Sequence, residues 1–183
     1  YLAYFEKTGK KPDRFSTALL GTKISEEDII SGIDDEGFEF FRPSNIASAI
    51  ADLLADDNVV IRVNGAMEFG PRALGSRSIL YQCKDVEVNH WLNEKLNRSE
   101  FMPFAPATLG SMFEKYFVCG SHHRQRGKFM TMTFDCTKDM LREAPAAVHV
   151  DSTARPQVVS QNDYPDFFRV LVGYHAKTGL GNL

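Results

Sequence analysis

Apolar residues recur at helical spacing in several stretches of the chain. The clearest stretch follows Pro43-Ser44, where the apolar positions are Ile46, Ala49, Ile50, Leu53 and Leu54. Ser25 is a candidate N-cap for a helix that runs through Ile33, because the acidic residues 26–28 suit the positive end of the helix dipole. Similar patterns predict further helices at residues 85–96, 110–118, 137–143 and 163–177.

Other stretches have the short apolar runs or the alternation that are typical of strands. Residues 59–63 read Val-Val-Ile-Arg-Val, which predicts a buried strand, and residues 129–134 alternate in the manner of a half-buried strand. Shorter strands are predicted at residues 38–41, 78–82, 148–150 and 156–159. Helices and strands therefore alternate along the chain, which predicts a mixed α/β fold: a twisted mixed sheet with helices packed on it.

A glycine-rich stretch follows the first apolar strand. Residues 65–80 read G-A-M-E-F-G-P-R-A-L-G-S-R-S-I-L, and their glycines and proline indicate a loop. Glycine lets a ligand come close to the backbone, and the guanidinium groups of Arg72 and Arg77 suit phosphate or carboxylate oxygens. The stretch is neither a P-loop nor a G-x-G-x-x-G motif. The alternative is a structural loop, in which one arginine pairs with a carboxylate such as Glu68.

A second candidate for anion binding is the stretch Asp151-Ser152-Thr153-Ala154-Arg155, between two predicted strands. Its hydroxyl groups and its arginine could converge on an oxyanion. The alternative is a tight turn in which the aspartate side chain bonds its own backbone.

Composition narrows the class of protein. The 183 residues allow one domain with a sizeable core, and 43% hydrophobic and 25% charged residues are ordinary for a globular protein. A net charge of −3 makes a broad nucleic-acid-binding surface unexpected. No apolar run has the length of a membrane span, and three widely spaced cysteines favour reduced thiols in a cytoplasmic protein.

Metal binding is not expected from this sequence. Cys119, His122 and His123 lie close together in sequence, but they lack a convincing fourth ligand. The surrounding residues 120–128 are polar and basic, and they predict a mobile surface loop.

Three stretches carry a resemblance to a known family. Residues 67–80 resemble the signature of the carbamoyltransferases that include the nodulation and antibiotic-tailoring O-carbamoyltransferases. Residues 96–106 (L-N-R-S-E-F-M-P-F-A-P) and 149–157 (H-V-D-S-T-A-R-P-Q) are similar to further motifs of that family, in the same order. The resemblance covers the chain from about residue 20 to its end and implies the family's C-terminal, YrdC-like domain. Residues 1–21 would then enter from a missing N-terminal domain, and residues 22–183 would form the YrdC-like domain, truncated at its C-terminal end.

The resemblance implies a reaction. Such a domain binds ATP, with Mg²⁺ on its phosphates, and carbamoyl phosphate; it forms carbamoyl-adenylate and releases pyrophosphate. A Kae1-like domain of the same polypeptide then transfers the carbamoyl group to a hydroxyl. The nucleotide would be held by arginines and hydroxyls of the three motifs, namely Arg72, Arg77, Arg98, Ser152, Thr153 and Arg155. Arg72 and Arg155 would also stabilise the charge that develops during the reaction.

The chain departs from the family pattern at two basic positions. Asn97 stands where similar proteins often have lysine, and Ala66 stands where arginine is frequent. The chain also stops at residues 178–183, where similar proteins continue into a Leu-Asn-Thr-Ser-Phe-Asn motif. The alternative function is a non-catalytic YrdC-like module that binds nucleotides or RNA, with Arg124, Arg126 and Lys128 extending its basic face.

Overall fold

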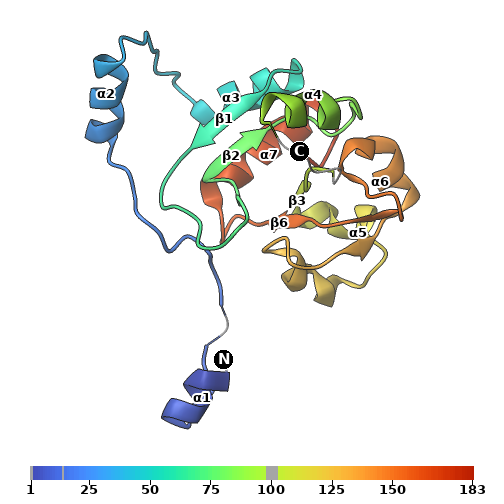
Figure 1. The fold of residues 1–183 in the computed structure, drawn as a ribbon. Coiled ribbons are helices and arrows are strands. Elements are labelled where there is room, and N and C mark those ends of the chain that lie inside the picture. Colours follow the sequence, from blue (N-terminus) through green and yellow to red (C-terminus); the bar gives the residue numbers. More distant parts are fainter. Residues whose placement is uncertain (1, 14, 98–102) are drawn as a thin grey trace.

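The computed structural model describes residues 2–13, 15–97 and 103–183, and Figure 1 shows how their elements are arranged. The α-helices are α1 (Leu2–Thr8), α2 (Glu26–Asp35), α3 (Ile46–Ala55), α4 (Val88–Lys95), α5 (Phe113–Tyr116), α6 (Lys138–Glu143) and α7 (Pro165–Thr178). The strands are β1 (Val60–Val63), β2 (Arg77–Leu80), β3 (Ala107–Leu109), β4 (Phe134–Asp135), β5 (Thr153–Ala154) and β6 (Gln157–Val159). Three 3₁₀ helices complete the elements of the described residues: η1 (Gly110–Met112), η2 (Ser121–Gly127) and η3 (Pro145–Ala147).

The mixed α/β class predicted from the sequence is confirmed. In the described part of the chain the strands form three small sheets of two strands each. β1 pairs with β2 and β4 with β5, both antiparallel, whereas β3 pairs with β6 in parallel. The last residues of the chain extend the β3–β6 pair, because Ala107 and Leu183 exchange two backbone hydrogen bonds of 2.8 and 3.1 Å.

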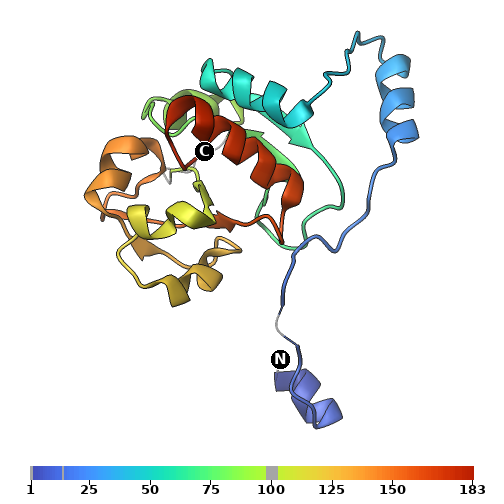
Figure 2. The same ribbon diagram turned by 180° about the vertical axis from the view of Figure 1, so that it is seen from behind.

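The main core lies where α3 packs against α7, as Figure 2 shows from behind. Ala51 and Leu54 of α3 are fully buried there, as is Leu171 of α7. The two helices approach closely because α7 has glycine at the contact: a Cβ on Gly173 would lie 3.0 Å from the Cβ of Ala51. The predicted helix is confirmed.

The apolar positions that predicted α3 do not coincide with its buried face. Ile46 and Leu53 belong to that set, but 62% and 47% of their surfaces are exposed. The helix instead turns its small residues, Ala47 and Ala51, towards α7. Helical periodicity is satisfied by either face, and close packing at Gly173 selects the smaller side chains.

A second cluster of buried side chains lies under α5 and α6. Its largest members are the rings of Phe113, Tyr116, Phe117 and Phe134. The predicted helix at residues 110–118 is split into η1 and α5, and the predicted strand at 129–134 is reduced to β4 at its end. The loop predicted at residues 120–128 is a 3₁₀ helix, η2, whose Gly127 is buried against Val158.

The N-terminal part of the chain forms an arm that extends away from the two cores (Figure 1). The predicted helix after Ser25 is confirmed as α2, with a capping box between Ser25 and Asp28, but none of its residues is buried. The strand predicted at residues 38–41 is wrong, because these residues form no ladder and Phe41 is 81% exposed. Among the described residues before α3, only Ala18 is buried.

None of the helices in the described ranges is both long and apolar enough to cross a membrane.

Candidate functional site

A cavity of about 560 Å³ lies between the glycine-rich loop, α4 and the β3–β6 pair. Its volume is within the range of small-molecule sites. The residues that line it come from distant parts of the sequence, including Arg72, Arg77, Tyr81, Asn89, Leu92, Phe104, Met130, Arg155, Gln157, Phe167 and Leu183. A lining that combines arginines with apolar side chains suits a ligand that is both charged and partly apolar.

Two of the predicted site residues reach this cavity from separate motifs. Arg72 lies in the glycine-rich loop and is exposed, whereas Arg155 directly follows β5 and is half-buried. Arg98, the third arginine of the prediction, lies outside the described residues. Leu96 and Pro103, the lining residues closest to it in the sequence, come from either side of that gap.

Arg77 also lines the cavity, but its donors are directed at the loop. Its guanidinium donates to the carbonyl oxygens of Asn64 at 3.0 Å, Ser76 at 2.9 Å and Gly65 at 3.2 Å. These bonds join the two ends of the loop. Arg77 therefore fixes the shape of the loop in addition to bordering the cavity.

Glu68 holds the same loop from within. One of its carboxylate oxygens, Oε1, accepts hydrogen bonds from the backbone N–H groups of Leu74 at 2.8 Å, Ser76 at 2.7 Å and Arg77 at 3.2 Å. Partial burial by itself would raise the pKa of Glu68, but these N–H donors outweigh it and hold the pKa below its usual value. The expected pairing of Glu68 with an arginine side chain is replaced by this set of backbone contacts.

Two buried polar residues beneath the loop were not predicted. Arg62 of β1 is only 8% exposed; it donates to the carbonyl oxygen of Gly75 and lies 5.5 Å from the ring centre of Phe167. Burial lowers the pKa of Arg62, and the nearby carboxylates of Asp166 and Glu68 oppose that shift.

Gln157 of β6 supports the same loop from another side. It is 1% exposed, lines the cavity, and donates from Nε2 to the carbonyl oxygen of Leu74 at 2.7 Å. The sequence offered one signal for Arg62: it is the single charged residue in a strand with a period of two, on the face opposite Ile61 and Val63. We find no such signal for Gln157.

The threonine hydroxyl of the third motif is used within a turn. Thr153 donates from Oγ1 to Asp151 Oδ1 at 2.7 Å and from its backbone to the same oxygen at 3.0 Å. These bonds lower the pKa of Asp151. Ser152 has a φ of 63°, in the left-handed region, as the turn requires. Neither Ser152 nor Thr153 lies among the described residues that line the cavity.

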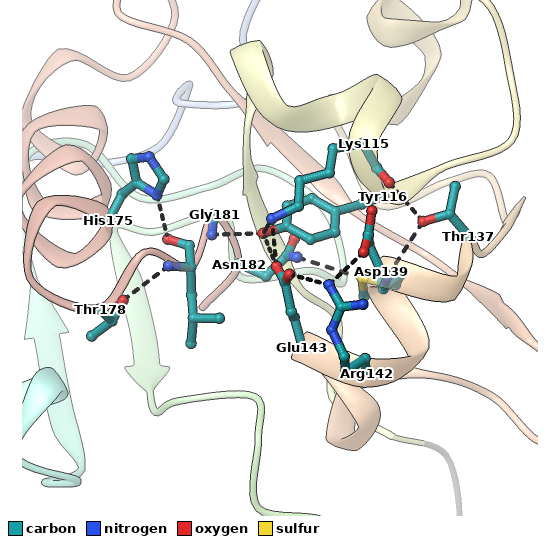
Figure 3. A network of polar contacts seen from close by, with 12 residues as sticks. Lys115, Tyr116, Thr137, Asp139, Arg142, Glu143, His175, Thr178, Gly181 and Asn182 are labelled. Carbon is teal, nitrogen blue, oxygen red and sulfur yellow. Dashed lines mark hydrogen bonds and ion pairs between the residues drawn. The ribbon is translucent and has the colours of Figure 1, made fainter.

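The C-terminal wall of the cavity is held by a partly buried polar network around Tyr116, which Figure 3 shows. The Tyr116 hydroxyl accepts from the Gly181 N–H at 3.0 Å and donates to Glu143 Oε2 at 2.9 Å. Lys115 and Arg142 also donate to this carboxylate, at 2.6 and 2.9 Å.

The same network fixes the last residues of the chain. Asn182 accepts at Oδ1 from the Thr108 hydroxyl at 2.6 Å, and Leu183 pairs with Ala107 of β3. Both Leu183 and Ala107 line the cavity. Partial burial would raise the pKa of Glu143, but its three side-chain donors hold that pKa at about 2.

The described lining of the cavity contains no aspartate or glutamate. Cys83 is its one thiol, and burial raises the pKa of that thiol to about 12, so it stays protonated at neutral pH. The described lining therefore offers guanidinium, amide and hydroxyl groups to a ligand, but no carboxylate for a divalent cation.

Comparison with known proteins identifies the family to which this chain is similar. The family model for the carbamoyltransferase C-terminus matches residues 51–183. A protein of Methanocaldococcus jannaschii is 34% identical over 158 residues, which are 86% of this chain and 30% of that protein. Nodulation protein NolO of Bradyrhizobium diazoefficiens is 35% identical, over 76% of this chain and 25% of its own length. Nodulation protein U of Sinorhizobium fredii is 35% identical over 73% of this chain and 23% of its own length.

The chain thus spans between about a fifth and a third of the length of these relatives. The three stretches singled out in the sequence, at residues 67–80, 96–106 and 149–157, all lie inside the matched region. The arm before α3 lies outside it.

Proposed function

The chain belongs to the carbamoyltransferase family through that family's C-terminal region, and on this premise we propose that its cavity binds ATP and carbamoyl phosphate. In the proposed reaction this YrdC-like domain forms carbamoyl-adenylate, and a Kae1-like domain in the same polypeptide transfers the carbamoyl group to a hydroxyl. The full-length protein is then an ATP-dependent O-carbamoyltransferase. The observation that carries the proposal is that Arg72 and Arg155, from two separate motifs, line one cavity.

The chemistry suits a site of this composition. Hydrolysis of carbamoyl phosphate gives phosphate and carbamate. A carbamate oxygen then forms a bond to the α-phosphorus of ATP, the bond to the bridging oxygen breaks, and pyrophosphate leaves. In this second step carbamate is itself the nucleophile and needs no base, so the site acts there by positioning and by stabilising negative charge.

The residues of this chain would divide that work. Arg72 and Arg155 face the phosphate groups, and Arg98 would add a third guanidinium from the second motif. Arg77 would hold the two ends of the loop that carries Arg72 together. Mg²⁺ neutralises the phosphates when it is bound with the nucleotide. The apolar lining, with Phe104 and Leu92, suits the base of a nucleotide.

The alternative of a non-catalytic module that binds RNA has less support. Two of the cations that would extend its basic face are engaged in ion pairs, Arg124 with Glu114 at 2.7 Å and Lys128 with Asp163 at 2.8 Å. These groups are partly neutralised before any ligand arrives. Affinity for RNA that exceeds the affinity for ATP and falls steeply with salt would favour the alternative.

The test is product analysis with the full-length polypeptide, ATP, Mg²⁺ and carbamoyl phosphate. The proposal predicts pyrophosphate and products at the level of AMP, formed only when carbamoyl phosphate is present. Formation of ADP without any dependence on carbamoyl phosphate would exclude it. We expect the 183-residue chain alone to turn over slowly or not at all, because the transfer domain is separate.

A matched pair of variants tests the role of the cavity arginines. Arg155→Ala in the full-length enzyme should cost about 2–4 kcal/mol of transition-state stabilisation, by analogy with the loss of one preorganised donor. Arg126→Ala is the control, because this arginine is exposed and lies outside the cavity lining. Equal turnover of the two variants would place Arg155 outside the reaction.

We also propose a cytoplasmic location, which rests on the three free cysteines, Cys83, Cys119 and Cys136.

A further inference from the structure

The N-terminal arm touches the glycine-rich loop at one place. There, residues 18–23 run alongside residues 66–69, and we call residues 18–23 the brace. The Phe69 N–H donates to the carbonyl oxygen of Ala18 at 2.7 Å, and the Met67 N–H donates to that of Thr22 at 3.0 Å. In return the Gly21 N–H donates to the carbonyl oxygen of Met67 at 2.9 Å. Figure 1 shows the arm passing beside the loop between β1 and β2 at this point.

We propose that the brace positions the loop that carries Arg72. Packing of the brace against the loop, which we call the seated arm, and binding of a phosphate-containing ligand in the cavity then favour each other. This inference rests on the proposed function, because it concerns the same cavity. It assigns a binding role to a segment that lies outside the matched family region of residues 51–183.

The loop needs support because its own backbone is permissive. Gly65, Gly70 and Gly75 all have positive φ, at 59°, 110° and 101°. Glycine loses more conformational freedom on ordering than any other residue, so a free loop of this kind would occupy many conformations. Each contact that holds it in one conformation lowers the entropic cost of binding a ligand there.

Glu68 and the brace contact different parts of the loop. Glu68 holds the later part, through the N–H groups of residues 74, 76 and 77. The brace holds the earlier part, at residues 66–69, just before Arg72. Without the brace, Arg77 would still hold the carbonyl oxygens of Asn64 and Gly65, but the hydrogen bonds described for residues 66–69 would be those of the Glu68 side chain.

The brace also joins the arm to the main core, in addition to the contact between the rings of Phe15 and Phe129. Ala18 is 4% exposed and belongs to the main core, together with Leu74 of the loop. Gly21 packs so closely on the loop that a Cβ there would lie 2.7 Å from the Cβ of Met67. The described residues on either side of the brace, up to α3, are exposed or only half-buried. A change in the position of the arm therefore reaches the loop at the brace.

Linkage makes the proposal reciprocal. If the seated arm raises the affinity of the cavity for an anionic ligand by some factor, the ligand must favour the seated arm by the same factor. Couplings of this kind typically amount to about 5- to 150-fold.

Two glycines of the arm provide a matched experiment in the full-length polypeptide. Gly21→Ala places a methyl group against Met67, whereas Gly32→Ala, in α2, places one in open space. Neither position has a positive φ, so alanine is allowed at both. Gly21→Val is a larger version of the first change. Inorganic pyrophosphate is the probe; its affinity is measured by calorimetry, and hydrogen exchange is followed at the Met67 and Phe69 amides.

We expect Gly21→Ala and Gly21→Val to speed exchange at both amides and to weaken pyrophosphate binding at least fivefold. Gly32→Ala should change neither quantity. In the wild type, pyrophosphate should slow exchange of the Phe69 amide, which donates to the brace and not to the ligand.

Two results would overturn the proposal. One is a Gly21 variant whose Met67 and Phe69 amides exchange faster but whose affinity for pyrophosphate stays within twofold of the wild type. The other is unchanged exchange in both Gly21 variants, because the close seat on Met67 would then not exist. Failure of the proposed function gives a different pattern: Arg72→Ala would leave the pyrophosphate affinity unchanged, whatever happens at Gly21. Absence of any pyrophosphate binding by the wild type would overturn both proposals.

Discussion

Replacing Tyr116 by phenylalanine should destabilise the fold through a single atom. The Tyr116 ring is fully buried, so Tyr116→Phe keeps its packing and removes only the hydroxyl. That hydroxyl accepts from the Gly181 N–H and donates to the Glu143 carboxylate (Figure 3). Since Gly181 is itself buried, its N–H group loses a partner at a place where water does not easily replace it.

The magnitude follows from these two bonds. A buried donor left without a partner costs about 1–3 kcal/mol, and a hydrogen bond to a charged group contributes about 1.5–3 kcal/mol. Part of this is recovered because the hydroxyl no longer has to be desolvated. We expect a net loss of about 2–3 kcal/mol, which corresponds to a Tm lower by roughly 4–12 °C for a chain of this size.

Urea unfolding of Tyr116→Phe and of a control, Tyr4→Phe, measures the effect. Tyr4 lies on α1, which has no buried residue, so its variant should stay within about 0.5 kcal/mol of the wild type. Hydrogen exchange should also quicken at the amide of Leu183, which lies two residues after Gly181 and donates to the carbonyl oxygen of Ala107 in β3. A loss below about 0.5 kcal/mol in Tyr116→Phe would refute the reasoning, since it would mean that the Gly181 N–H has another partner.

Three further predictions concern the loop and the helix contact. Arg72→Ala should weaken the affinity for ATP and leave the unfolding free energy within about 0.5 kcal/mol, because Arg72 is exposed; calorimetry and urea unfolding check the two parts. The folded-state pKa of Glu68 is depressed, so the free energy that its ionised carboxylate contributes to stability is fully present above its unfolded pKa and is lost as pH falls through the folded pKa. Melting curves against pH should show this loss in the wild type and not in Glu68→Gln. Gly173→Ala should lower the Tm, because the new Cβ would lie 3.0 Å from that of Ala51, and an unchanged Tm would mean that α3 and α7 can separate without cost.

Elements whose signals are local were predictable from the sequence. Ser25 and Asp28 form the capping box that begins α2, and Asn45 caps α3 just after Pro43-Ser44. Helix α7 has proline at its start and ends at Gly179, which adopts the left-handed conformation with a φ of 75°. Each of these signals acts within a few residues, so it does not depend on the rest of the fold.

The buried face of a helix is not a local property. Periodicity predicted α3, but Ile46 and Leu53 are exposed whereas Ala47 and Ala51 are buried. The choice depends on α7, more than a hundred residues later, whose Gly173 lets the alanine face approach. The size of the gap between two helices could not be read from either helix alone.

The residues of the candidate site were also predictable only in part. The motifs predicted that Arg72 and Arg155 would share a site, and both line one cavity. The polar residues that support the loop from beneath, Arg62 and Gln157, were missed because both lie in short apolar runs that give no sign of a partner. Their partners are backbone carbonyls of the loop, and a backbone group leaves no trace in the sequence.

The orientation of β1 shows that the strand and the loop that follows it depend on each other. With a period of two, Arg62 and Ile61 cannot both face the core, and it is Ile61 that is 75% exposed. Burying a guanidinium is costly unless hydrogen bonds and opposite charges compensate. Here the Gly75 carbonyl of the loop accepts from Arg62, and the carboxylates of Asp166 in α7 and Glu68 in the loop favour its charged form. The glycine-rich loop therefore borders the cavity and, together with Asp166, compensates the inward arginine of the strand that precedes it.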